Sequence, residues 1–133
     1  NLKELYVGDN QLASIDLSGV PNLNMLSIYK NPLTSLDLST NTKITELICR
    51  ECQLEGTLGL SANPMLQKLG CYNNNLSAIK IAPNSSLGKL EIERNNIKGE
   101  NMTALVNALP KFQVLPDYDD WYGMDPQCIV AGL

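Results

Sequence analysis

Few side chains in this sequence are suited to catalysis or to metal binding. The chain has 133 residues with no histidine and four cysteines, Cys49, Cys52, Cys71 and Cys128. Cys49 and Cys52 form a Cys-x-x-Cys pair, a spacing that zinc sites use. Because no histidine is available to complete such a site, we expect no metal ion here and no cofactor.

An acidic and aromatic segment, residues 117–125, is a second candidate site. Its carboxylates could bind calcium, and its aromatic rings could stack on a sugar. The residues concerned are Asp117, Asp119, Asp120 and Asp125 with Tyr118, Trp121 and Tyr122. The carboxylates lack the ordered spacing of a calcium loop. Carbohydrate binding through this segment therefore stays a weaker alternative to a solvated loop whose aromatic rings cover the end of the fold.

The usual arrangements for acid-base or nucleophilic catalysis are missing from the sequence. It has no histidine, no glycine-rich phosphate loop and no serine in a nucleophile-elbow motif. Glu91 and Glu93 form a carboxylate pair, but a glycosidase needs two carboxylates at a set separation. We expect this protein not to be an enzyme.

Composition and charge narrow the class of partner. The net charge is −4, and the ten basic residues are scattered along the chain, which disfavours nucleic acid because phosphate binding needs a concentrated basic surface. No stretch approaches the roughly 18 consecutive apolar residues of a membrane span. Apolar residues make up 44% of the chain but only seven residues are aromatic, so we expect one domain, residues 1–133, with an aliphatic core.

A repeat organises residues 2 to about 97. Segments beginning at Leu2, Leu23, Ile44, Leu66 and Leu87 align with a period of 21 residues and one extra residue in the third. Each carries the pattern LxxLxLxxNxL or a close variant, in which two apolar residues alternate with others at the period-two spacing of a half-buried strand. These pairs are Leu5 and Val7, Leu26 and Ile28, Leu47 and Cys49, Leu69 and Cys71, and Leu90 and Ile92. The pattern predicts five short parallel strands.

This repeat resembles the leucine-rich-repeat proteins, and its LDLS returns, strand cysteines and 21-residue period resemble those of bacterial surface or secreted proteins. The resemblance implies an α/β-type repeat solenoid that is predominantly β, a right-handed arc with a parallel concave sheet and an extended convex side. In this family one turn column is a buried ladder that satisfies backbone groups. The matching residues here are Asn10, Asn31, Cys52, Asn74 and Asn95. The thiol of Cys52 is a weaker hydrogen-bond donor than an amide, so it should stabilise its turn less.

The returning half of each repeat again has apolar residues at period two. They are Ile15 and Leu17, Leu36 and Leu38, Leu58 and Leu60, and Ile79 and Ile81, and they predict an extended convex side. Cys49 and Cys71 occupy inward positions of adjacent strands and Cys52 lies in the ladder, so we expect free, buried thiols. Cys128 has no obvious partner.

The two ends of the repeat differ. Met102, Leu105, Val106 and Leu109 follow helical spacing before Pro110, which predicts a capping helix within a C-terminal cap of about residues 99–133. Residues 112–115 could add an edge strand, and Asp125 before Pro126 could begin a short helix. Asn1 leads directly into the first repeat, so we expect either that residues before it are missing or that this uncapped edge contacts another chain.

Residues between the inward ones should face solvent on the concave sheet. Six of them would form a contiguous, mixed apolar patch: Tyr6, Met25, Tyr29, Ile48, Arg50 and Tyr72. Tyrosine and arginine are enriched where interfaces concentrate their binding energy, whereas the alternative is that these types simply suit any strand.

We therefore expect a protein-protein interaction module, with a structural spacer or stalk in a larger surface protein as the alternative. The resemblance implies an extracellular or cell-surface location, while the residues are also compatible with a cytoplasmic one.

Overall fold

The computed structural model describes residues 1–110, which form a stack of coils. Each coil contributes one short strand to a parallel sheet in the order β1-β2-β3-β5-β7. These strands are β1 (Glu4–Tyr6), β2 (Met25–Ser27), β3 (Glu46–Ile48), β5 (Lys68–Gly70) and β7 (Lys89–Glu91). Their registers align Leu5, Leu26, Leu47, Leu69 and Leu90 in one row. The prediction of five parallel strands is confirmed, and the architecture is that of a leucine-rich-repeat arc.

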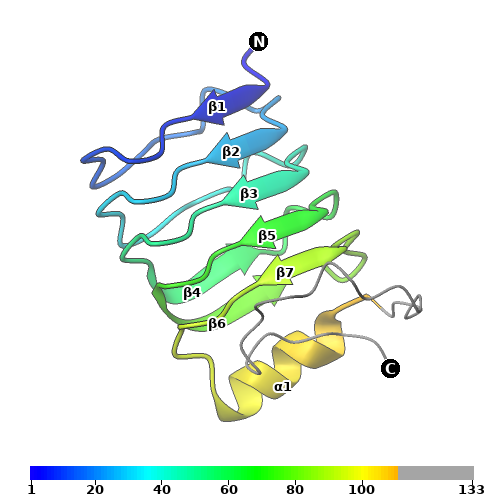
Figure 1. The fold of residues 1–133 in the computed structure, drawn as a ribbon. Helices are drawn as coiled ribbons and strands as arrows, with labels where there is room; N and C mark the ends of the chain where they lie inside the picture. Colours follow the sequence, from blue (N-terminus) through cyan, green and yellow to red (C-terminus); the bar gives the residue numbers. More distant parts are fainter. Residues whose placement is uncertain (111–133) are drawn as a thin grey trace, which may run out of the picture.

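The returning segments form the opposite layer of the solenoid (Figure 1). β4 (Glu55–Leu60) and β6 (Asn75–Ile81) pair there in parallel, whereas the returns of the first two coils are extended without strand pairing. The inward residues of the returns are buried or half-buried as the period-two spacing predicts. The extended convex side is confirmed.

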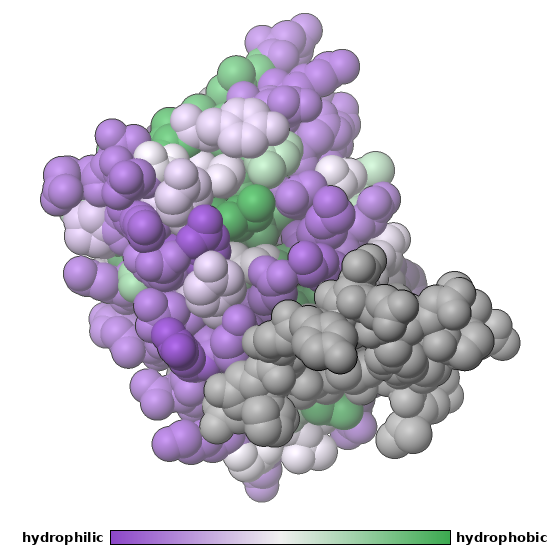
Figure 2. All heavy atoms as spheres, in the orientation of Figure 1, coloured by the Kyte–Doolittle hydropathy of each residue, from purple (hydrophilic) through white to green (hydrophobic). Residues whose placement is uncertain are grey.

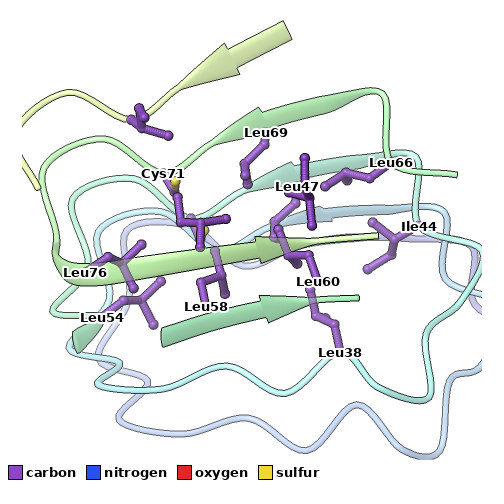
Figure 3. Close-up of a cluster of buried hydrophobic side chains, with 14 of the residues drawn as sticks. Leu38, Ile44, Leu47, Leu54, Leu58, Leu60, Leu66, Leu69, Cys71 and Leu76 are labelled. Atoms are coloured by element: carbon purple, nitrogen blue, oxygen red, sulfur yellow. The ribbon is translucent and has the colours of Figure 1, made fainter. Parts of the chain in front are cut away.

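The core lies between these two layers and is almost entirely aliphatic (Figure 3). Leu26 and Leu47 are 0% exposed and Leu69 is 1% exposed, because each is covered by the coils on either side of it. Full burial of a leucine contributes about 2 kcal/mol relative to exposure. No coil can gain this alone, so the apolar interior is a property of the stack.

The first coil is less well covered than the inner ones. Its inward residues Leu5, Val7, Leu12 and Ile15 are only partly buried, and Leu2 is 42% exposed. β1 forms the outer edge of the five-stranded sheet (Figure 1). Within the described residues the first coil therefore has a neighbouring coil on one side only.

The opposite end of the stack is covered by α1 (Gly99–Ala108), which contacts β6. Leu105 and Leu109 are buried and Met102 is partly buried, which confirms the predicted capping helix over these residues. Val106, which the helical spacing grouped with them, is 41% exposed. The remainder of the expected cap, including residues 112–115 and the helix start at Asp125, lies outside the described residues.

The predicted polar ladder follows the strands of the concave sheet. The Asn74 amide nitrogen donates to the carbonyls of Cys49 and Cys71, both at 2.9 Å, and its oxygen accepts the Leu54 N–H at 3.1 Å. Asn31 in the second coil and Asn95 in the fifth coil make the equivalent hydrogen bonds. These side chains satisfy backbone groups that the turns would otherwise leave buried and unpaired.

Two members of this column differ from the other three. Asn10 is exposed and donates only within its own rung, to Val7 and Gly8, so the prediction that it is buried is wrong; no coil lies on its outer side in this structure to cover it. The Cys52 thiol donates to the Ile28 carbonyl at 3.3 Å. It carries no amide oxygen, so this rung lacks the strong acceptor that Asn31, Asn74 and Asn95 provide.

The turn before each ladder residue has a left-handed backbone. Asp9, Lys30, Glu51, Asn73 and Arg94 all have φ between 51° and 58°. The same conformation in every coil shows that the stack selects one turn geometry, which these side chains tolerate at a modest cost.

A second asparagine ladder, which the sequence analysis did not predict, lies where the returns lead back to the concave strands. Asn41 donates to the carbonyls of Leu17 and Val20, and Asn63 donates to those of Leu38 and Asn41. The signal was available in the sequence, because Asn41 and Asn63 occupy the same place in successive repeats. Asn84 follows at the next repeat but is exposed, so position in the repeat alone does not decide burial.

The strand pairing on the convex side contains one irregularity. The pairing of β4 with β6 shifts register between Gly56 and Thr57, and Gly56 has φ of +68°. The residue skipped by this shift is Ser77 on β6, between Leu76 and Ala78, and glycine tolerates the left-handed backbone at position 56 without a side-chain clash. Leu58 and Leu60 return to pair with Ile79 and Ile81, so the core is undisturbed.

We expect Gly56→Ala to lower the free energy of unfolding by about 1 kcal/mol, because alanine is strained at a positive φ. Nothing lies within 4 Å of a Cβ at Gly56 or at Gly59, so Gly59→Ala on the same strand is the matched control and should cost less. Urea unfolding of the three proteins measures the difference. Equal effects of the two substitutions would contradict a requirement for glycine at the left-handed backbone of position 56.

We expect Cys52→Asn to raise the free energy of unfolding by about 1 kcal/mol, because it restores an amide acceptor and a stronger donor to a buried rung. Cys52→Ala, which removes the bond to Ile28, should lower it. Both are measured by urea unfolding under reducing conditions. A destabilised Cys52→Asn protein would show that the column does not accept asparagine in every rung.

Candidate binding surface

The concave sheet presents its outward side chains in columns, one residue per coil. Because the strands are in register, residues at equivalent positions stand beside one another at the spacing of neighbouring strands, about 4.8 Å. Figure 2 shows this face, where green and pale residues gather over β2 and β3 between hydrophilic purple ones. The face is therefore a strip of mixed polarity bordered by polar and charged side chains.

Arg50 is the centre of the column that follows the strands. Its guanidinium carbon lies 4.5 Å from the centroid of the Tyr29 ring and 5.6 Å from that of the Tyr72 ring. Both distances are within the range of cation-π attraction. Three of the six predicted patch residues, from three successive coils, are thus in direct contact. We call Tyr29, Arg50 and Tyr72 the aromatic strip.

Glu51 completes the environment of Arg50. Its Oε1 accepts a charge-assisted hydrogen bond from Arg50 Nη1, and both side chains remain about 30% exposed. The guanidinium is therefore held by two rings and a carboxylate, which leaves it little rotational freedom. Sequence reasoning missed Glu51, because nothing in the repeat indicates that a turn residue reaches back to its neighbour.

Tyr6 is the most exposed aromatic side chain of the predicted patch. It is 63% exposed, and its hydroxyl donates to Glu4 Oε2 at 3.1 Å. This hydrogen bond is the main cause of the raised pKa of the Tyr6 hydroxyl. Met25 on β2 and Ile48 on β3 are half-buried.

Two residues in the outward columns do not reach solvent. Ser27 is 5% exposed, and Gly70 is also buried, because their neighbours on the face are larger. The Glu91 carboxylate lies 3.3 Å from the position that a Cβ on Gly70 would occupy. The period-two rule assigned these residues to the correct face, but not their exposure.

Two ion pairs lie on the outward face of the sheet. Lys68 pairs with Glu46 at 3.4 Å and Lys89 pairs with Glu91 at 2.9 Å. The hydrogen bond to Glu91 is the main cause of the raised pKa of Lys89. These pairs are largely exposed, so each stabilises the fold only slightly; their effect is to set a pattern of charges around the aromatic residues.

The cysteines lie away from this face. Cys49 and Cys71 are inward and 0% exposed, and burial raises the pKa of both thiols. Cys52 is in the ladder, and the three are free. Within residues 1–110 no group of three or more cysteine, aspartate or glutamate side chains is placed to hold a metal ion. Cys128 and the whole of the acidic, aromatic segment 117–125, with Trp121, lie outside the described residues.

A polar hollow of about 330 Å³ lies at the turn edge, beside the ladder, and shares Glu51 with the environment of Arg50. It is lined by Lys30, Glu51, Cys52, Asn73, Asn74 and Asn75. Its walls are almost entirely polar, and Asn74 and Cys52 are already engaged with backbone groups. The aromatic strip is therefore the stronger candidate for binding.

The stacked coils, the parallel sheet and the polar ladders define a leucine-rich-repeat solenoid. A search of solved structures finds the functional domain of InlJ from Listeria monocytogenes, described as including a cysteine ladder, at 23% sequence identity and a TM-score of 0.37. The match covers 71% of this chain and 30% of that one. No protein-family model matches the sequence, and a search of curated proteins finds no match.

Residues 1–110 contain no helix with the length and apolar character that crossing a bilayer requires.

We expect Arg50→Lys to lower the free energy of unfolding by about 1 kcal/mol, because an ammonium group cannot stack between two rings as a planar guanidinium does. Arg94→Lys, an exposed residue outside the Tyr29 and Tyr72 contact, is the control and should change it by less than about 0.5 kcal/mol. Thermal and urea unfolding measure both. If the two variants have the same stability, the contact with the rings contributes nothing.

Proposed function

We propose that this protein is a protein-binding module that captures a macromolecular partner on its concave face. The observation that carries the proposal is the contact of Arg50 with Tyr29 and Tyr72 on the outward side of the parallel sheet. Tyrosine and arginine are the residue types that dominate interface hot spots. Here they are gathered from three coils and already ordered by one another.

The proposed contact surface consists of the aromatic strip and its flanking residues. Its members are Tyr6, Met25, Tyr29, Ile48, Arg50 and Tyr72. Tyr6 offers a large exposed ring, Met25 and Ile48 supply adaptable apolar area, and the Arg50 guanidinium supplies several donors. The ion pairs of Lys68 and Lys89 would lie at the rim, where charge sets orientation more than affinity.

The repeat architecture also favours binding on this face. Backbone hydrogen bonds and ladder side chains hold the strands in place, so the surface side chains are free of any role in the core. Solenoids commonly use the extended surface formed in this way to contact a partner. A rigid surface loses little conformational entropy on binding, which leaves more of the contact energy as affinity.

The proposed cellular location of the module, and its place in a larger protein, rest only on the resemblance of its repeats to those of other proteins. We place the module at a bacterial cell surface, as part of a larger protein, because its 21-residue period and LDLS returns resemble those of surface leucine-rich-repeat proteins. The open N-terminal edge, with Leu2 exposed, offers a second place of contact to a neighbouring chain or domain. An enzymatic role is not proposed.

The proposal is tested by trapping the partner and then weakening the strip. A photoreactive phenylalanine analogue at Tyr6 should cross-link a partner from the surrounding cells or medium, whereas the same analogue at Ser35, exposed on the convex side, should not. The captured protein is purified and its Kd measured by calorimetry. Tyr29→Ala with Tyr72→Ala should weaken binding at least about 30-fold, which corresponds to a hot-spot loss of about 2 kcal/mol.

Ser14→Ala with Ser35→Ala on the convex side is the matched control and should leave Kd unchanged. The melting temperature of the double tyrosine variant should fall only slightly, because neither residue belongs to the aliphatic core. Undiminished affinity in that variant would overturn the proposal and favour a spacer. A glycan signal that is lost in Trp121→Ala would point to carbohydrate binding instead.

A further inference from the structure

Gly8 occupies a position that carries a side chain in the other coils. The equivalent residues are Tyr29, Arg50, Tyr72 and Glu93. The backbone on either side of Gly8 is hydrogen-bonded to the second coil, through Val7 to Ser27 and Asp9 to Tyr29, both at 2.8 Å. Its φ is not in the left-handed region that favours glycine, so the backbone does not require glycine here.

The space that a Gly8 side chain would fill is taken by the Tyr29 ring. A Cβ built on Gly8 would overlap three atoms of that ring, Cδ1, Cε1 and Cζ. Among the glycines of residues 1–110, no other meets a neighbour so closely; at Gly19 and Gly59 nothing lies within 4 Å. Glycine at position 8 is therefore explained by Tyr29.

Tyr29 is in turn in contact with Arg50. Because the first coil has no side chain at position 8, the Tyr29 ring can lie across the backbone of that coil. Arg50 follows it, with its guanidinium carbon 1.1 Å nearer to the Tyr29 centroid (4.5 Å) than to the Tyr72 centroid (5.6 Å). Gly8, Tyr29 and Arg50, from three successive coils, are thus linked by direct contacts.

We propose that Gly8 is a positioning residue for the binding surface. By leaving room for the Tyr29 ring, it orders Tyr29 and Arg50 in their contact before any partner arrives. Its consequence for affinity rests on the proposed function, whereas the dependence of Arg50 on Gly8 is a property of the free protein. Anchors that are ordered in advance lose less entropy on binding, so Gly8→Ala should weaken partner binding by about tenfold without removing any contact residue.

The direct test is NMR of the free protein with labelled arginine and tyrosine side chains. In Gly8→Ala the Tyr29 ring resonances and the Arg50 side-chain N–H resonances should shift toward values typical of exposed side chains, since the ring no longer covers the guanidinium. Gly19→Ala is the control and should leave both sets unchanged. A folded Gly8→Ala protein with unchanged Arg50 resonances would overturn the proposal.

A double-mutant cycle covers the case in which Gly8→Ala folds poorly. If the cost arises from collision with the ring, Gly8→Ala should lower the melting temperature far less in a Tyr29→Ser background, so the two substitutions should be strongly non-additive. Additive effects would overturn the proposal. Both tests use the free protein, so their outcomes do not depend on a partner. Failure of the proposed function would be seen differently, as partner binding that survives the loss of Tyr29 and Tyr72.

Discussion

The structure depends on the burial of inward leucines between neighbouring coils. A single coil exposes apolar side chains on both of its edges, and only another coil of the same shape covers them. Leu26, Leu47 and Leu69 are fully buried because each has a coil on both sides, whereas Leu5 at the edge is only partly buried. Equal coil shape is therefore a condition of stability, and the other regular features of the fold follow from it.

The polar ladders allow the coils to stack in this way. A turn at the edge of a packed interior leaves backbone carbonyls and N–H groups without partners, and such groups are costly when buried. Asn74 donates to carbonyls of its own coil and of the preceding one, and Asn63 at the other edge donates to two carbonyls of the preceding coil. The ladders thus act with the leucines, because they hold the coils at one separation while the leucines fill the space between them.

The same stacking also builds the binding surface. Positions that are 21 or 22 residues apart become neighbours on the concave sheet, so a contact such as that of Tyr29, Arg50 and Tyr72 needs no loop to assemble it. The core and the surface are carried by alternate residues of the same strands. Changes on the surface can therefore alter binding while the core keeps the fold, which suits a module whose proposed role is recognition.

The sequence by itself determined the coils, the parallel strands, the extended returns, the start of the capping helix and most of the ladder. These follow from the spacing of leucine, isoleucine and asparagine, since burial in a stack allows only one face for each residue. The tertiary structure decided how side chains of different coils meet. The contact of Tyr29 with Gly8, the position of Arg50 beside the Tyr29 and Tyr72 rings, and the burial of Ser27 and Gly70 depend on the size and direction of neighbours that lie a whole coil away. Periodicity assigns a residue to a face, but it carries no information about which neighbour its side chain will contact.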